Sequence, residues 1–131
     1  MRIEAERLIR QGERDLLNAA KNVEIEAYEV AAFLSEQAVE KFLKAAWILW
    51  KAELPPHTHY LLELGRGLQM PEQLLRRLAF LNPDYTVSRY PDAANGVPFE
   101  LYDRPTALAK LAAAREVIEW VRSEIRSSPN S

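Results

Sequence analysis

Apolar residues recur at every third or fourth position along most of the chain, which is the spacing of the buried face of an α-helix. The strongest example spans residues 27–52. Its apolar stripe consists of Ala31, Leu34, Ala38, Phe42, Ala45 and Leu49. The opposite side is polar, yet it is flanked by Phe33, Trp47 and Ile48. Apolar groups on both sides of a helix indicate either a central position in a bundle or a second surface that meets a partner.

The same spacing predicts a first helix over residues 2–21, with Gly12 in the middle of its apolar face. A glycine inside a helix is about 1 kcal/mol less favourable than an alanine, so we expect another backbone to approach closely at Gly12. Asp15 lies at the edge of this face. It is either a surface carboxylate that pairs locally with a Lys or Arg or part of a functional site.

Three further helices are predicted beyond the two consecutive prolines that end the second helix. They cover residues 58–65, 71–81 and 103–127. Thr58 or its neighbours are expected to cap the first of them, and Asp103 the last. Trp120 falls off the buried stripe of the last helix, so it either lies across a neighbouring groove or marks a subunit contact.

The chain shows no strand pattern and no internal repeat, so it is predicted to be an all-α, antiparallel, up-and-down bundle of four main helices plus a short helix. Residues 1–127 form a single domain in this prediction, and residues 128–131 form a frayed tail. A long irregular stretch is expected over residues 85–98, where prolines and an Asn-Gly pair prevent a continuous helix. Loops of this length are usually functional or disordered, and the aromatic residues here argue against disorder.

Composition excludes several classes of protein. The 131 residues contain no cysteine, which excludes disulfides, thiolate metal sites and cysteine nucleophiles. The 17 basic and 19 acidic residues give a net charge of −2, so only a local basic pocket, and no sequence-wide attraction to nucleic acid, is expected. The first ten residues are too charged for a signal peptide, and the run AAWILW is too short to cross a bilayer. We therefore expect a soluble, cytoplasmic protein without membrane contact.

The common enzyme motifs are not found: the sequence contains no G-x-S-x-G, P-loop or Rossmann glycine pattern. The two histidines, at positions 57 and 59, do not share a helical face, and no metal site is predicted. The polar residues that a bundle could bring together are Gln37, Glu40, Lys41, Lys44, His57 or His59, Tyr85, Arg89, Tyr90 and Asp92. Because Arg and Lys can hold phosphate and Tyr can stack on a base, this set suits a nucleotide or an RNA end. The alternative is an ordinary exposed face with a Glu40–Lys44 pair that contributes about 0.2–0.5 kcal/mol.

Four separated segments carry a family resemblance. In order, they are Asp15-Leu16, Gln37-Ala38-x-Glu40-Lys41-x-x-Lys44-Ala45, Thr58-His59 and Tyr85-x-x-x-Arg89-Tyr90-Pro91-Asp92. Together they resemble the HEPN domain, the higher eukaryotes and prokaryotes nucleotide-binding family, over nearly the whole chain. The resemblance implies an antiparallel helical bundle that is commonly a homodimer and is often encoded beside a minimal nucleotidyltransferase.

Many members of this family are metal-independent ribonucleases whose active site is an Arg followed four to six residues later by a His. In such a site the His acts as general base or acid and the Arg holds the phosphate. This chain departs from that pattern, because the residues at these distances from Arg89 are Ala93, Ala94 and Asn95 and no other arginine has a His at this spacing. Arg89 and His59 remain the catalytic candidates, provided that the fold brings them together.

These observations lead to three hypotheses about function. The first is a nucleotide-binding subunit, catalytically weak or inactive, that dimerises and pairs with a nucleotidyltransferase in a toxin–antitoxin-like module. Its ligand would be a nucleotide such as ATP, and no other cofactor or metal is expected. The second is a metal-independent ribonuclease that cleaves single-stranded RNA with His57 or His59. The third is a protein–protein interaction module without a ligand, in which the polar face is structural.

Overall fold

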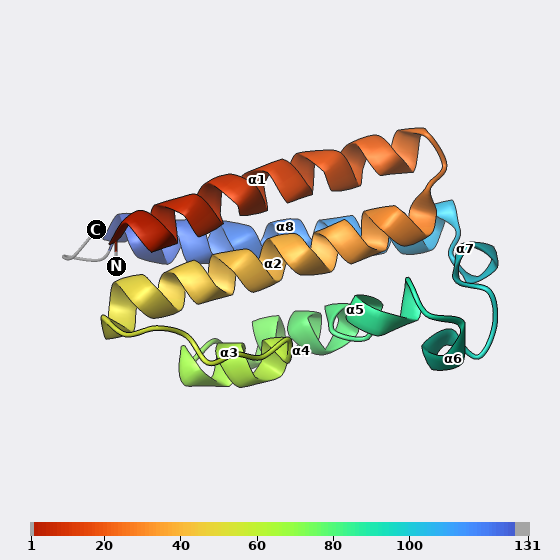
Figure 1. The fold of residues 1–131 in the computed structure, drawn as a ribbon. Helices are drawn as coiled ribbons and strands as arrows, with labels where there is room; N and C mark the ends of the chain where they lie inside the picture. The colour runs from red at the N-terminus through yellow and green to blue at the C-terminus, as the bar shows by residue number, and fades with distance from the viewer. Residues whose placement is uncertain (1, 128–131) are drawn as a thin grey trace.

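The computed structural model describes residues 2–127 as a bundle of α-helices (Figure 1). The long helices are α1 (Arg2–Glu24), α2 (Tyr28–Lys51) and α8 (Arg104–Ser127). Between α2 and α8 lie α3 (Leu61–Gly67), α4 (Glu72–Leu81) and three single turns, α5 (Asp84–Val87), α6 (Pro91–Ala94) and α7 (Pro98–Leu101). Residues 2–127 contain no strand, so the predicted all-α fold class is confirmed. The predicted frayed tail, residues 128–131, lies outside the described residues.

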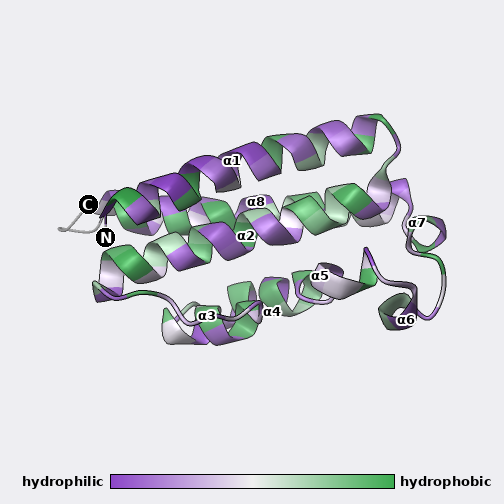
Figure 2. Ribbon diagram, viewed as in Figure 1, coloured by the Kyte–Doolittle hydropathy of each residue, from purple (hydrophilic) through white to green (hydrophobic). Residues whose placement is uncertain are grey.

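The four main helices α1, α2, α4 and α8 run alternately up and down, as the sequence predicts (Figure 1). α1 begins and α8 ends at the same end of the bundle. α2 packs against both α1 and α8, and five of its alanines are completely buried. In Figure 2, hydrophilic residues dominate α1, whereas hydrophobic residues are more frequent along α2. α2 therefore takes the central position in the bundle.

Gly12 has two close neighbours on α2, of which only the backbone was expected. A Cβ at this position would lie 2.9 Å from two ring carbons of Phe42 and 3.4 Å from the backbone oxygen of Ala38. The glycine thus makes room mainly for an aromatic side chain, and the approach of another backbone is secondary. The expected backbone neighbour is the carbonyl of Ala38, but the ring of Phe42, which lies on the stripe of α2 that faces α1, comes closer.

Trp120 lies across a neighbouring helix, which was one of the two alternatives for it. Its ring meets the ring of Trp50 edge to face, with the centroids 5.7 Å apart. Both rings pack against the main hydrophobic core. Edge-to-face aromatic pairs contribute about 0.5–1.5 kcal/mol beyond the area that they bury, so this contact ties the end of α8 to the end of α2.

The cap of α3 comes from a different helix than the sequence suggested. The side-chain oxygen of Asn82, at the end of α4, accepts a hydrogen bond from the backbone N–H of Leu61 at 2.7 Å. The Asn82 amide also donates to the backbone oxygen of His59 at 3.2 Å. The Thr58 hydroxyl instead accepts from the N–H of Tyr60, before the helix begins. The prediction of a cap by Thr58 or its neighbours was therefore wrong, whereas Asp103 caps α8 as predicted, at 2.9 Å from the backbone nitrogen of Thr106.

Residues 85–98 are less irregular than the sequence suggested, because they include most of α5, all of α6 and the start of α7. Pro91 and Pro98 stand at the first position of α6 and α7, where a fixed φ and a missing N–H are tolerated. Asn95 ends α6 with a left-handed φ of 54°. The prolines thus prevent one long helix and start two short ones.

No helix within residues 2–127 is long and apolar enough to cross a membrane.

Candidate functional site

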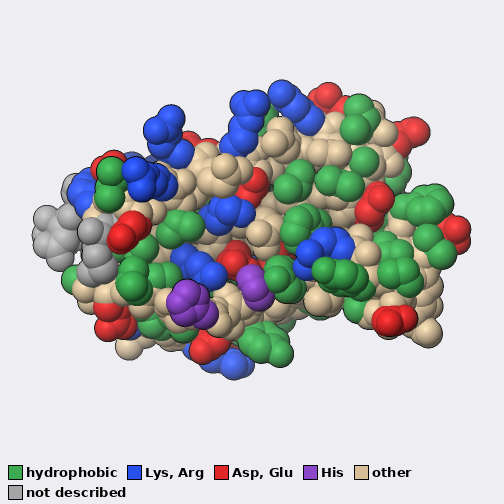
Figure 3. Space-filling model, in the orientation of Figure 1, with side chains coloured by type: hydrophobic (Ala, Val, Ile, Leu, Met, Phe, Trp, Pro, Cys, Tyr) green, Lys and Arg blue, Asp and Glu red, His purple; other side chains and the backbone are tan. Residues whose placement is uncertain are grey.

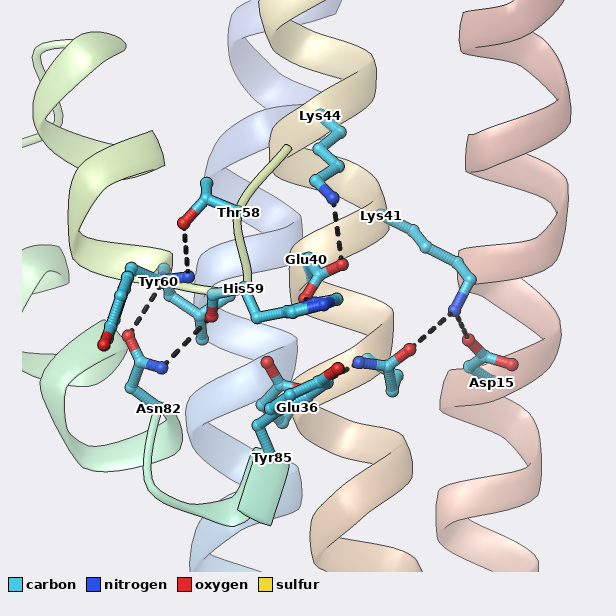
Figure 4. Close-up of polar contacts among 12 residues, drawn as sticks. Asp15, Glu36, Glu40, Lys41, Lys44, Thr58, His59, Tyr60, Asn82 and Tyr85 are labelled. Carbon is cyan, nitrogen blue, oxygen red and sulfur yellow. Dashed lines mark hydrogen bonds and ion pairs between the residues drawn. The ribbon is translucent and has the colours of Figure 1, made fainter. Parts of the chain in front are cut away.

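The polar residues of α2 form ion pairs that begin at the boundary with α1. Lys41 Nζ lies 2.7 Å from a carboxylate oxygen of the buried Asp15 and donates to the side-chain oxygen of Gln37 at 3.3 Å. One turn further along, Lys44 Nζ lies 3.1 Å from Glu40, which is also buried (Figure 4). Each lysine is therefore neutralised by a carboxylate, and the side chains are held in fixed positions.

His59, in the segment before α3, contacts both the polar residues of α2 and the α5 turn. Its Nδ1 lies 3.0 Å from the second carboxylate oxygen of Glu40. Its ring stacks on the ring of Tyr85, with centroids 4.0 Å apart and planes inclined by 18°. The side chain of His59 is 54% exposed, and its Nε2 has no partner among the described residues. Both histidines are visible on the face of the molecule in Figure 3, beside Lys and Arg side chains.

Arg89 lies against the same tyrosine. Its guanidinium carbon is 4.6 Å from the centroid of Tyr85, 4.5 Å from that of Phe33 and 4.9 Å from that of Tyr90. Its Nε donates to the backbone oxygen of Tyr85 at 2.7 Å, and one terminal nitrogen donates to the same oxygen. The guanidinium is thus oriented by three rings and a carbonyl, an arrangement that cation–π attraction favours.

Tyr85 therefore contacts both His59 and Arg89, which the sequence could not establish. The two candidates come from the segment before α3 and from the turn after α5, 30 positions apart in the chain. The close-up in Figure 4 shows Tyr85 and His59 next to Glu40 on α2. The fold thus places an imidazole and a guanidinium that are far apart in the sequence against the same tyrosine ring.

A cleft with a volume of about 680 Å³ opens beside this cluster. One wall comes from residues 57–60 and Leu62, and the other from the end of α4, the residues that follow it and the α5 turn; the lining includes His57, His59, Asn82 and Tyr85. The volume falls within the range of small-molecule sites, which is about 300–1,000 Å³. Because His59 and Tyr85 belong to both the cleft and the cluster, a ligand in the cleft would contact the cluster.

Two of the predicted site residues lie at the margin. Tyr90 is 52% exposed and contacts the site through the guanidinium of Arg89. Asp92 is exposed in the first turn of α6 and makes no hydrogen bond or ion pair with the other described site residues. The structure therefore brings together Gln37, Glu40, Lys41, Lys44, His59, Tyr85 and Arg89, and leaves Asp92 apart.

Glu36 is a site residue that the sequence did not indicate. It is completely buried on α2, and one of its oxygens accepts a hydrogen bond from the Gln37 amide at 2.8 Å while the other has no partner. Burial, with smaller contributions from the neighbouring carboxylates of Glu40 and Asp84, raises the pKa of this carboxyl to about 8, against the lowering effects of the Gln37 hydrogen bond and of Lys41. Glu36 is thus a neutral acid within the polar layer at neutral pH.

A buried ionic cluster holds the α5 turn that carries Tyr85. Asp84, the preceding residue, lies 2.8 Å from Lys110 Nζ on α8 and accepts a hydrogen bond from the Tyr102 hydroxyl. Burial, followed by the contact with Asp84, raises the pKa of Tyr102. Lys110 also donates to the backbone oxygen of Phe80 at 2.6 Å. The only signal in the sequence was the place of Lys110 next to the buried stripe of the last helix.

Within residues 2–127, no group of three or more His, Asp or Glu side chains is arranged to hold a metal ion.

Comparisons with known proteins relate this geometry to a family. Similar solved structures include TT1696 from Thermus thermophilus (25% identity, 92% of this chain and 98% of that chain, TM-score 0.83). An archaeal HEPN homologue, ST0689, is 33% identical over 93% of this chain and 98% of that one, with a TM-score of 0.81. A HEPN domain protein from Thermotoga maritima, tm0613, shares the fold at 21% identity over 93% of this chain and 99% of that one, with a TM-score of 0.73. A search of curated proteins gives no match. The family model for the HEPN domain matches residues 5–124, and the chain therefore belongs to the HEPN domain family.

Proposed function

We propose that this chain is a nucleotide-binding subunit whose ligand lies in the cleft beside His59 and Tyr85, with its phosphates at Arg89. The observation that carries this proposal is the contact of one tyrosine ring with both an imidazole and a guanidinium at the edge of a cleft of about 680 Å³. Aromatic rings can stack on a base, and a guanidinium forms paired hydrogen bonds to phosphate oxygens. A base in the cleft would stack on the half-exposed ring of His59, and the phosphates would extend to Arg89 on the other side of Tyr85.

Arg89 is better suited to the phosphate contact than the two lysines. A guanidinium has five N–H donors, and Arg89 uses only its Nε and one terminal nitrogen to bond the backbone of Tyr85. Lys41 and Lys44 are already paired with Asp15 and Glu40. We therefore assign phosphate binding to Arg89. Lys44 positions Glu40 and through it His59, whereas Lys41 and Gln37 bind Asp15 and Glu36.

The proposal extends to assembly. On the family resemblance, the chain forms a homodimer and pairs with a minimal nucleotidyltransferase in a toxin–antitoxin-like module, and it is catalytically weak because no Arg in the sequence is followed by a His at the ribonuclease spacing. Light scattering is expected to give the mass of a dimer at micromolar concentration. A monomer under these conditions would contradict this part of the proposal, as would failure to co-purify with a nucleotidyltransferase encoded beside the chain.

Calorimetric titration of ATP tests the nucleotide site. Wild-type protein is expected to bind ATP saturably, and Arg89→Ala to weaken binding by about 10- to 100-fold, because a hydrogen bond to a charged group contributes about 1.5–3 kcal/mol. The matched control is Arg115→Ala, which removes an exposed arginine from α8, a helix that contributes no residue to the cleft. No heat at millimolar ATP, or equal affinities for both variants, would contradict the assignment.

A ribonuclease activity is the second candidate, and one observation favours it. Glu40 accepts from Nδ1 of His59, which fixes the ring and leaves Nε2 free to accept a proton. In such a reaction Nε2 removes the proton of a ribose 2′-hydroxyl, the 2′-oxygen attacks phosphorus, and the 5′-oxygen leaves and takes up a proton. Arg89 would stabilise the negative charge on the phosphate. The products would be a 2′,3′-cyclic phosphate and a 5′-hydroxyl.

Incubation of end-labelled single-stranded RNA with the protein in the presence of EDTA tests this candidate. Cleavage is expected without metal and is expected to be lost in His59→Ala. His57→Ala is the matched control, because His57 also lines the cleft but has no carboxylate on its ring in the described structure. Cleavage that survives His59→Ala, or no cleavage by the wild type, would exclude this mechanism.

A further inference from the structure

The outer side of α1 carries a row of cations. Arg7, Arg10, Arg14 and Lys21 follow one another at intervals of three, four and seven residues, which places them on one narrow stripe of the helix. All four are exposed, and the stripe lies opposite the buried residues of α1. With a rise of 1.5 Å per residue, the row spans about 21 Å. We call these four residues the basic ridge. Lys and Arg side chains line the part of Figure 3 where α1 lies.

No carboxylate neutralises the basic ridge within residues 2–127. Three acids of α1 form ion pairs with cations outside the ridge: Glu6 with Arg2 at 3.5 Å, Glu13 with Arg122 at 3.4 Å and Asp15 with Lys41 at 2.7 Å. Like charges three or four residues apart on a helix repel each other by a few tenths of a kcal/mol, about 0.2–0.5 per pair. The ridge therefore retains a repulsion that a bound anion would remove.

The shape and chemistry of the ridge suit phosphate groups. Arg7, Arg10 and Arg14, with Gln11, line a shallow depression of about 400 Å³. The planar guanidinium forms two parallel hydrogen bonds to phosphate, whereas the ammonium of lysine acts as a point charge. Three arginines in one row can thus bind successive phosphates along a chain.

Neutralised ion pairs of α1 and α2 lie between the ridge, which points away from the core, and the nucleotide site. Asp15 follows Arg14 directly and pairs with Lys41 across the boundary between α1 and α2. Lys44, nearly one turn further along α2, pairs with Glu40, which contacts His59. Figure 3 shows cationic side chains and both histidines on the same face of the molecule. An extended anion on the ridge would pass over these pairs to reach the aromatic cluster.

A membrane surface is a poor partner for this ridge, because the apolar face of α1 is already packed in the core and cannot enter a bilayer. The ridge is one straight row, and the site beyond it offers the partly exposed rings of Tyr85 and Tyr90, on which unpaired bases can stack. We propose that the basic ridge binds the phosphate backbone of a single-stranded nucleic acid whose bases reach His59 and Tyr85. This inference rests on the proposed nucleotide site and names a longer ligand for it.

Fluorescence anisotropy with a labelled oligouridylate of about 12 nucleotides tests the ridge. The triple variant Arg7→Gln/Arg10→Gln/Arg14→Gln is compared with the wild type over a range of salt concentrations. Each phosphate contact contributes about 0.7 to the slope of log K against log salt for a single strand. Losing three contacts is expected to reduce the slope by about 2 and to weaken binding about 100-fold at 0.1 M salt.

The matched control is Arg76→Gln/Arg104→Gln/Arg115→Gln, which removes the same charge from exposed positions on α4 and α8. This control is expected to bind the oligonucleotide nearly as well as the wild type. Equal losses in the two triple variants, no loss in the ridge variant, or no binding by the wild type would overturn the proposal. So would a change in the mass of the ridge variant by light scattering, because it would identify the ridge as a subunit interface. Circular dichroism checks that both variants keep their helix content.

ATP titrations separate a failure of the ridge from a failure of the nucleotide site. The ridge variant is expected to bind ATP as the wild type does, because a mononucleotide in the cleft does not extend to α1. If ATP binding depends on Arg89 but the ridge variant binds the oligonucleotide as tightly as the wild type, only the inference about the ridge fails. If ATP binding is missing or independent of Arg89, the nucleotide site itself fails.

Discussion

Glu36 is the residue whose ionisation departs most from its ordinary behaviour. Its carboxyl is completely buried, and its pKa is raised from 4.5 to about 8, first by burial and then by Glu40 and Asp84. A neutral carboxyl at this place keeps a second negative charge away from the layer that holds His59. Glu36 therefore keeps its proton in the folded protein at pH values at which the same carboxyl is ionised in the unfolded chain.

Stability is therefore predicted to depend on pH through Glu36. Between pH 4.5 and about 8, the unfolded chain releases this proton while the folded chain keeps it. The free energy of unfolding should thus fall as pH rises through this window, with a slope of at most about 1.4 kcal/mol per pH unit. In Glu36→Gln this slope should be absent, and the variant should be more stable than the wild type near pH 8.

Urea unfolding at a series of pH values measures this effect. Glu63→Gln is the matched control, because Glu63 is exposed on α3 and its removal should leave the slope unchanged. Parallel pH profiles for the wild type and Glu36→Gln would show that Glu36 is ionised in the folded protein at neutral pH.

At the scale of elements, the site depends on how the short α5 turn is fixed. Four residues cannot form a stable helix alone, and α5 is held by the contact of Asp84 with Lys110 and Tyr102. Because Tyr85 follows Asp84, this buried cluster sets the position of the ring that meets His59 and Arg89. The α3 cap by Asn82 similarly fixes the segment that carries His59, since its amide binds the backbone oxygen of that residue.

Lys110→Met is predicted to destabilise the protein by about 3–5 kcal/mol, because it leaves a buried carboxylate without its cation. The double variant with Asp84→Asn should recover part of this loss. Arg77→Met is the control: it breaks the Arg77–Glu116 pair, whose side chains are 43% and 39% exposed, and should change stability by no more than about 1 kcal/mol. Urea unfolding gives these values. Equal losses for Lys110→Met and Arg77→Met would contradict the role of the buried cluster.

These elements show which parts the sequence could predict. The stripes of α1, α2 and α8 and the Asp103 cap were predicted because each depends on residues within a few turns of one another. The Asn82 cap of α3 and the Asp84–Lys110 pair join positions 21 and 26 residues apart. No local pattern encodes such contacts. The short helices α5–α7 were missed because prolines that end one helix also begin another.

At the scale of the whole molecule, the packing of several elements creates the site and its cleft. The site needs α2, the segment before α3 and α5 at once, and its cleft exists only when these three pack together. Gln37, Glu40, Lys41 and Lys44 were predicted as candidates from their shared face, but their pairing with Asp15 and His59 followed from the arrangement of helices. The charge distribution is similarly a property of the whole. A chain with a net charge of −2 still presents an uncompensated basic ridge, because the neighbouring acids Glu6, Glu13 and Asp15 pair with other cations.

The central claim is that a nucleotide binds where Tyr85 contacts both His59 and Arg89. NMR titration of isotope-labelled protein with ATP tests it most directly, because the imidazole of His59 and the Nε–H of Arg89 give separate signals. We predict saturable shifts of both signals and of the Tyr85 amide, with only small changes at exposed positions of α8 such as Arg115. Shifts confined to other surfaces, or no shifts at millimolar ATP, would contradict the account.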